Sequence, residues 1–214
     1  MNLTANNPKK LPMSIVCLFL GVCSLGAALS LNPMLAQTAP PISHVPAGWF
    51  LAGSKPASYR TSVDKELIRD GQPSAYLLSA APVPDGFGTL MQSISAANYA
   101  GKRVRLRASI QSRDVDDWAG IWLRADKGQT AVAFDNMQNR AIKGTQAWSP
   151  HDVVLDIPED ATGISFGVLL SGTGEVWVNH MTFEIVDKQV AVTFPGSSPK
   201  APLPASPVNL NFKE

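Results

Sequence analysis

Carboxylates are the first candidates for catalytic side chains in this sequence. Asp114, Asp116 and Asp117 lie within four positions of each other, and Asp126 and Asp135 follow nearby. A glycosidase needs two carboxyl groups that face each other across one sugar bond, in environments that separate their pKa values. The spacing here fixes no such pair, so "SRDVDD", residues 112–117, is interpreted as a solvated turn between two strands. A structural calcium ion held by loop oxygens is the intermediate alternative, and the sequence assigns it no ligands.

Other kinds of catalysis find little support among the remaining residues. His44, His151 and His180 are far apart and have no metal-binding spacing. Nucleophile elbows, phosphate loops and dinucleotide fingerprints do not occur in the sequence. Both cysteines, Cys17 and Cys23, fall in an apolar N-terminal segment that we expect to be removed. The sequence therefore predicts a protein that is not an enzyme and holds no cofactor.

Two tryptophans in "DDWAGIWLRAD", residues 116–126, point to binding instead. If "WAGIWLRA" is a strand, its side chains alternate between two faces. The core face then carries Ala119, Ile121, Leu123 and Ala125, and the outer face carries Trp118, Gly120, Trp122 and Arg124. In the next segment, "TAVAFDNMQ", Val132 and Phe134 are expected to point inward, which places Asp135 on the outer side. Arg105 and Arg107 of the preceding strand are expected on an outer face as well.

The predicted ligand-binding residues are therefore Trp118, Trp122, Arg124, Asp135, Arg105 and Arg107. Sugar rings present apolar C–H faces that pack on indole rings, while their hydroxyls need charged or amide partners at the edges. Gly120, between the two indoles, would let such a ring approach the backbone. The alternative of equal weight is that a loop or the N-terminal segment of the chain covers this face, with arginine stacked on indole as structural packing.

Short strands must position these residues, because the apolar period between residues 48 and 187 is mostly two. In "RVRLRASIQS", Val104, Leu106, Ala108 and Ile110 share one face; in "GISFGVLL", Ile164, Phe166, Val168 and Leu170 do the same; in "VWVNHMTFEIV", Trp177, Met181, Phe183 and Ile185 are expected together. Turn signals such as "RDGQP", "VPDGFG" and "SGTGE" separate about ten such runs. The pattern predicts an all-β antiparallel β-sandwich, with a jelly roll as the favoured topology.

The two ends of the chain read differently from this domain, which spans residues 47–187. Residues 1–36 have the features of a signal peptide: Lys9 and Lys10, an apolar run and a cleavage site after Ala36. An uncleaved membrane anchor is the alternative. Residues 188–214 form a Pro-rich linker followed by "VNLNFKE", which alternates like a short terminal strand. Cleavage would remove two lysines and no acidic residue, and would change the formal net charge from +1 to −1. A nearly neutral domain lacks the positive charge that binding to nucleic acid requires.

Two long stretches also carry a family resemblance. "YAGKRVRLRASIQ" and "WSPHDVVLDIPEDATGISFGVLLSGTGEVWVNHMTFEIV" resemble the second half of a galactose-binding-like jelly roll, as found in bacterial carbohydrate-binding modules attached to cellulases and xylanases. The matching positions are Tyr99, Gly101, Lys102, Trp148, Pro158, Gly172, Gly174, Val176 and Trp177, and Asn179 replaces the usual aspartate. The front half resembles an uncharacterised branch of that superfamily, which also occurs beside bacterial transcription regulators.

Together these observations predict an exported, non-catalytic module, periplasmic or extracellular, that binds a carbohydrate or glycan polymer through the tryptophan face. The alternative from another class is a protein-interaction or assembly domain of the envelope, whose tryptophan face is an interface. A glycoside-acting enzyme ranks below both. We expect no nucleic-acid partner and no membrane association of the mature form.

Overall fold

The computed structural model describes residues 45–194, and the predicted signal peptide and most of the Pro-rich tail lie outside that range. The described residues form nine strands and two short 3₁₀ helices. Their bounds are β1 Phe50–Gly53, η1 Pro56–Ser58, β2 Tyr59–Arg69, β3 Gln72–Ser79, β4 Phe87–Ser95, β5 Arg103–Lys127, β6 Thr130–Asp135, η2 Gln138–Arg140, β7 Ile142–Asp156, β8 Gly163–Ser171 and β9 Glu175–Val186. In this part of the chain, no helix is long and apolar enough to cross a membrane.

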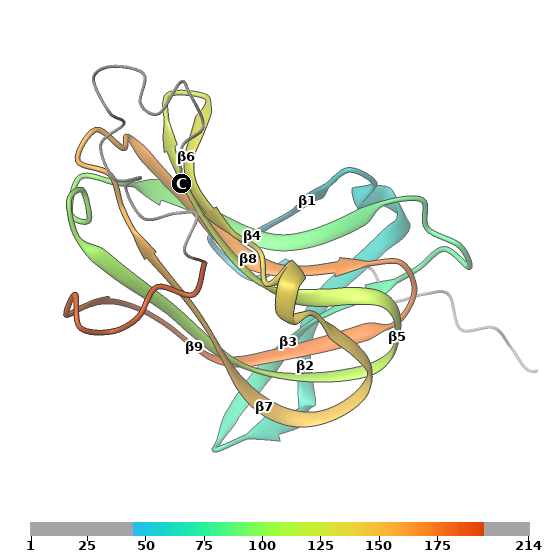
Figure 1. Cartoon of the computed structure of the whole chain (residues 1–214). Helices are drawn as coiled ribbons and strands as arrows, with labels where there is room; N and C mark the ends of the chain where they lie inside the picture. The colour runs from blue at the N-terminus through green and yellow to red at the C-terminus, as the bar shows by residue number, and fades with distance from the viewer. Residues whose placement is uncertain (1–44, 195–214) are drawn as a thin grey trace, which may run out of the picture. The chain divides into compact units, whose positions relative to one another are not determined.

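The long strand β5 joins two layers of antiparallel strands. Its residues 103–113 pair with β9 and its residues 103–119 contact β7, whereas its residues 118–127 pair with β8 and β6. We call β1, β4, β8, the second part of β5 and β6 the front sheet. The back sheet consists of β2, β3, β9, the first part of β5 and β7. Figure 1 shows β5 passing from one layer to the other. The predicted all-β sandwich is confirmed.

Residues 112–117 are part of this continuous strand, so their interpretation as a turn between two strands is wrong. The pairing register shifts along this segment, and Asp114 has a left-handed backbone with φ 51°. Irregularities of this kind bend a strand while its neighbours stay paired. The aspartates are exposed as expected, and Val115 between them is buried. The bend allows one strand to belong to both sheets, which sequence alternation does not reveal.

The core lies between the inward faces of the two sheets. The predicted inward set of β5, Ala119, Ile121, Leu123 and Ala125, is completely buried. It packs in one cluster with the inward residues of β8 and with Val104 and Leu106 from the back-sheet part of β5. Full burial of a Leu, Ile, Val or Phe side chain contributes about 1.5–3 kcal/mol. These contacts fix which side of each strand faces outward.

Strand β9 departs from the predicted alternation at one residue. His180 has φ 50°, and the register with β5 shifts beside it. Before His180 the inward residues are Val176 and Val178, whereas Trp177 points outward and lies under the guanidinium of Arg113 at 5.1 Å. After His180, Met181 and Phe183 pack against the core, while Ile185 is 50% exposed. Trp177 and Ile185 therefore do not join the face predicted for them.

Candidate functional site

The outer face of the front sheet can be reconstructed from strand register. Met91 of β4 lies opposite Gly167 of β8, and Gly167 lies opposite Trp122 of β5. One row further along, Arg124 of β5 lies opposite Phe134 of β6. Residues that oppose each other across paired strands project to the same side of the sheet. Trp122 and Arg124 therefore share the outer face, as predicted, and Met91 and Phe134 lie beside them.

Trp122 forms the floor of this face and is not an exposed platform. Its exposed fraction is 6%, and its indole Nε1–H donates a hydrogen bond to Thr89 Oγ1 at 2.8 Å. The Thr89 hydroxyl donates in turn to the carbonyl oxygen of Val168 at 2.8 Å. The ring of Phe134 meets the indole edge-on, with centroids 6.5 Å apart. The Trp122 side chain is therefore buried, which decides for this residue between the open and covered faces that the sequence left as alternatives.

The chain itself fills the space between the two tryptophans. A Cβ atom added to Gly120 would lie 3.0 Å from Met137 Cβ, so a sugar ring has no access to that backbone. Met137 follows β6 with φ 62° and is 1% exposed. Trp118 and Trp122 are four residues apart on one strand, so their Cα atoms are separated by about 13 Å. The joint Trp118–Trp122 platform is a wrong prediction, and the covered-face alternative is correct at Gly120.

Asp135 does not share the outer face, because β6 has the opposite phase from the prediction. Val132 and Phe134 are 37% and 43% exposed, whereas Ala133 and Asp135 are 5% and 3% exposed. A slip of one residue exchanges the two faces of a strand. The segment "TAVAFD" has apolar residues in both phases, so hydrophobic alternation alone did not decide between them. The consequence is that Phe134, expected in the core, becomes an exposed aromatic residue of the site.

Buried Asp135 is held by a set of hydrogen-bond donors. Its carboxylate accepts from Arg140 Nη2 at 2.7 Å, from Thr193 Oγ1 at 2.5 Å and from the backbone N–H of Met137 at 2.9 Å. Burial alone would raise the pKa of this carboxyl group, but the hydrogen bonds from Arg140, Thr193 and Met137 outweigh it and hold the pKa below its ordinary value. Asp135 thus fastens η2 and the segment around Thr193 to the end of β6.

Arg105 and Arg107 lie on the back sheet and not beside the tryptophans. Both belong to the first part of β5, where Arg105 pairs with Glu184 of β9 at 2.7 Å and Arg107 with Asp152 of β7 at 2.6 Å. The hydrogen bond and charge of Arg107 hold the pKa of Asp152 below its ordinary value. Grouping these arginines with Trp122 is wrong, because the bend in β5 separates them into different layers.

A first hollow opens on the outer face of the front sheet, and we call it the sheet hollow. It has a volume of about 300 Å³. Its aromatic, apolar and charged lining includes Phe87, Thr89, Met91, Trp122, Arg124 and Phe134. The Arg124 guanidinium is paired with Asp126 at 2.9 Å, and its side chain remains 42% exposed. The sheet hollow therefore combines an apolar floor with one accessible, charge-compensated donor group.

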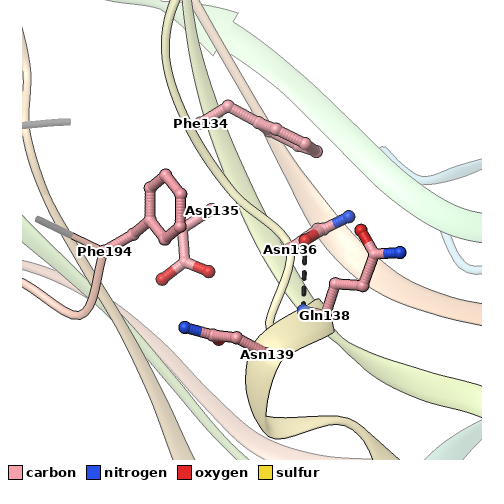
Figure 2. A pocket seen from close by; sticks show the side chains of 6 residues that line it. All are labelled: Phe134, Asp135, Asn136, Gln138, Asn139 and Phe194. Carbon is pink, nitrogen blue, oxygen red and sulfur yellow. Dashed lines mark hydrogen bonds between the residues drawn. The ribbon is translucent and has the colours of Figure 1, made fainter. Parts of the chain in front are cut away.

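A second hollow of about 410 Å³ adjoins the outer edge of β6, and we call it the rim hollow. Figure 2 shows its lining: Phe134, Asp135, Asn136, Gln138, Asn139 and Phe194. Phe134 lines both hollows. The amide residues of the rim were not among the predicted site residues. The signal was the run "DNMQNR", residues 135–140, which places three amides directly after a strand.

The aspartates considered for catalysis hold turns together. Asp116 Oδ1 accepts the backbone N–H of Thr173 at 2.6 Å, and Asp117 Oδ2 accepts the Ser171 hydroxyl at 2.6 Å. Asp114 accepts the hydroxyl of Thr145. Within residues 45–194, no three His, Cys, Asp or Glu side chains gather as a metal ion would require. The carboxylates of "SRDVDD" therefore connect β5 to the β8–β9 turn and to β7.

Comparison with known proteins adds one relative and a set of similar folds. No known protein-family model matches the chain. The uncharacterized HTH-type transcriptional regulator YbfP of Bacillus subtilis (strain 168) is 43% identical over 172 residues, which cover 78% of this chain and 57% of the regulator. The chain thus spans little more than half the length of this relative. The match agrees with the resemblance of the front half to a branch found beside transcription regulators.

Among solved structures, the CBM22-1 xylan-binding domain of Paenibacillus barcinonensis Xyn10C has a TM-score of 0.50 at 12% identity, covering 67% of this chain and 89% of that domain. A Stig cyclase from Fischerella sp. TAU has a TM-score of 0.47 at 12% identity, covering 72% of this chain and 92% of the cyclase. The likeness to the xylan-binding domain shows the fold alone. The described residues therefore share the antiparallel β-sandwich fold of this xylan-binding domain, and that fold fits the resemblance found in the sequence.

Proposed function

We propose that this protein is a non-catalytic module that binds a carbohydrate chain on the outer face of its front sheet. The observation that carries the proposal is Phe134, an aromatic residue that is 43% exposed and lines both the sheet hollow and the rim hollow. An exposed aromatic ring at a hollow offers a surface on which the apolar face of a sugar packs. The sharing of a fold with a xylan-binding domain supports the same function.

The polar groups around Phe134 complement a sugar. The Arg124 guanidinium lies beside it in the sheet hollow, and the amides of Asn136, Gln138 and Asn139 lie beside it in the rim hollow. Guanidinium and amide groups form hydrogen bonds with hydroxyl groups at the edge of a sugar ring, while the ring face contacts the aromatic residue. The site thus replaces the predicted tryptophan platform with a buried indole floor and an exposed phenylalanine.

The carboxylates near the hollows support a binding role over hydrolysis. Glycoside hydrolysis requires one carboxyl group that donates a proton and a second that acts as base or nucleophile. Asp126 is paired with Arg124 and Asp135 with Arg140, and the pKa of Asp135 is held below its ordinary value. The carboxyl group of Asp135, kept ionised in this way, cannot serve as a general acid near neutral pH.

Export of the protein is the second part of the proposal. It rests on the basic, apolar and small-residue pattern of residues 1–36, which lie outside the described residues. Protein isolated from its native host is expected to begin near Gln37, as determined by N-terminal sequencing. Recovery of Cys17 or Cys23 in the mature chain would contradict cleavage. A domain that recognises a sugar can serve an exported protein or a regulator, so the relative's name does not contradict the proposed binding site.

The binding proposal is tested with soluble xylan, mixed-linkage β-glucan, galactan and mannan in affinity electrophoresis. The wild-type chain is expected to be retarded by at least one of them. Phe134→Ala should weaken that binding about fivefold, because one aromatic–sugar contact is worth about 1 kcal/mol. Arg107→Ala is the control, since it changes an exposed residue of the back sheet. Wild-type binding to none of the four polysaccharides, or equal binding by Phe134→Ala, would contradict the proposal.

A protein interface on the same face is the second candidate. Phe50, on β1 at one edge of the front sheet, and Val132 and Phe134, on β6 at the other, are all more than a third exposed. Exposed apolar side chains can mark a protein interface. Sedimentation velocity of the wild-type chain and Phe134→Ala tests this candidate. Self-association that the substitution abolishes, in a chain that no polysaccharide retards, would favour the interface.

A further inference from the structure

The rim hollow gives the proposed site an extension beyond the edge of the front sheet. Its walls come from three separate segments: Phe134 is the next-to-last residue of β6, Asn139 belongs to η2, and Phe194 comes from the segment after β9. Figure 2 shows the ring of Phe194 and the amide of Asn139 among the side chains that line the hollow. Asp135 holds the three segments together through Arg140 and Thr193. The hollow is therefore a built feature of the fold.

The amides of the rim are oriented by the protein. The Oδ1 atom of Asn139 accepts a hydrogen bond from Arg140 Nη1 at 3.0 Å, and Asn136 Oδ1 accepts from the backbone N–H of Gln138 at 3.1 Å. These bonds use the amide oxygens and leave the Nδ2 groups as donors, with no acceptor among residues 45–194. A hydroxyl oxygen of a sugar accepts such donors. The aromatic rings beside them supply contact for the apolar ring face.

The charges around both hollows are compensated. In the rim hollow, Asp135 and Arg140 pair at 2.7 Å, and Arg140 also donates to a backbone carbonyl oxygen. In the sheet hollow, Arg124 pairs with Asp126 at 2.9 Å. An anionic ligand would have to compete with these carboxylates for the guanidinium groups. The chemistry of the site therefore matches a neutral sugar better than a uronic acid.

From these features we infer that the rim hollow is a second subsite, and that the ligand is a neutral oligosaccharide which crosses Phe134 and occupies both hollows. The inference rests on the function proposed above and specifies its ligand class. The sheet hollow, at about 300 Å³, is at the lower limit of the range of about 300–1,000 Å³ that small-molecule sites occupy. A ligand that enters only this hollow leaves the oriented amides of the rim unused, whereas a longer chain reaches them.

The test compares ligands of different length on the full chain. Two-unit and six-unit oligosaccharides of the polysaccharide that binds (xylo-, cello-, galacto- or manno-) are titrated by calorimetry. The six-unit chain is expected to bind at least about tenfold more tightly, since it gains the contacts of a second subsite. Asn139→Ala should weaken six-unit binding about fivefold through loss of one hydrogen bond and leave two-unit binding unchanged. The matched control is Asn98→Ala, an exposed asparagine that lines neither hollow.

A second readout follows the amide groups directly. In ¹H–¹⁵N spectra, the side-chain signals of Asn136 and Asn139 are expected to shift with the six-unit chain and not with the two-unit chain. Equal affinity for both lengths, or unchanged six-unit binding by Asn139→Ala, would overturn the second subsite while the proposed function stands. Tighter binding of hexagalacturonate than of the neutral six-unit chain would overturn the neutral ligand class. Absence of binding to every saccharide would overturn the proposed function and this inference together.

Discussion

Replacing Trp122 by alanine separates a buried floor from an exposed platform. The indole is 6% exposed, donates to Thr89 and contacts the ring of Phe134. Loss of a buried Trp or Phe side chain costs about 3–5 kcal/mol in unfolding free energy. Because the sheet hollow lies directly above the indole, water can enter the space that the substitution leaves. We therefore expect a loss near the lower end, at about 3 kcal/mol.

Two further variants divide this loss into its parts. Trp122→Phe keeps a six-membered aromatic ring but loses the indole N–H and part of the indole volume. It should therefore cost about 1 kcal/mol for the hydrogen bond and a further amount for the lost packing, and stay milder than Trp122→Ala. Thr89 stays satisfied in that variant because its hydroxyl donates to Val168. Phe134→Ala should cost less than about 1 kcal/mol, since its ring is already 43% exposed. The two neighbouring aromatic residues are thus expected to differ severalfold in their effect on stability.

Urea unfolding followed by far-UV circular dichroism measures these differences, because this signal does not depend on the tryptophan that is removed. With a slope of about 2 kcal/mol per molar urea, a loss of 3 kcal/mol moves the midpoint by about 1.5 M. A Trp122→Ala midpoint within about 0.3 M of wild type would refute the assignment of Trp122 as a buried floor. A Phe134→Ala shift as large as that of Trp122→Ala would show that Phe134 is also part of the core.

Three other perturbations have definite expected results. Asp135→Asn should lower the unfolding free energy at pH 7 by about 1–3 kcal/mol, because a buried carboxylate with charged partners is lost. Because the pKa of Asp135 is held below its ordinary value, the ionised carboxylate contributes fully to the unfolding free energy above about pH 4, and this contribution falls as the pH drops further. Acid unfolding of wild type compared with Asp135→Asn measures the loss. Gly120→Ala should destabilise by about 1–3 kcal/mol in urea unfolding, because its Cβ would lie 3.0 Å from Met137 Cβ; a gain in stability would contradict the filled space. Replacing Arg105 and Arg107 together by alanine should change the unfolding free energy by at most about 1 kcal/mol per exposed ion pair and leave polysaccharide binding unchanged. A loss of binding would show that these residues belong to the site.

Local alternation was enough to predict the fold class and most inward faces. The sets in β8 and in both parts of β5 are buried as predicted, because each includes large aliphatic side chains facing small or polar ones. The turns between strands were readable from Gly, Pro and Asp clusters for the same local reason. What the alternation could not predict was the continuity of β5, since its bend is stabilised by partners that are distant in sequence.

The candidate site was predictable only in part. Trp122 and Arg124 were placed on the correct face, because the residues that alternate with them in β5 are all apolar and clearly form the core face. The phase of β6 was wrong, since "TAVAFD" offers two similar apolar alternations. The grouping with Arg105 failed for a topological reason: neighbouring segments of one strand lie in different sheets. Long-range pairing decided both cases, and a single sequence contains no direct signal of such pairing.

The exposure of Phe134 follows from the burial of Asp135. The inward side of β6 is tolerated by the Asp135 carboxylate because Arg140, Thr193 and the backbone N–H of Met137 all donate to it there, which offsets the cost of burying its charge. With Asp135 directed inward to Arg140 and Thr193, the alternation of the strand directs Phe134 outward over Trp122. The same carboxylate holds η2 beside β6, which places the amide of Asn139 at the rim. The buried Asp135–Arg140 pair is therefore linked through β6 and η2 to both the aromatic and the amide components of the proposed binding site.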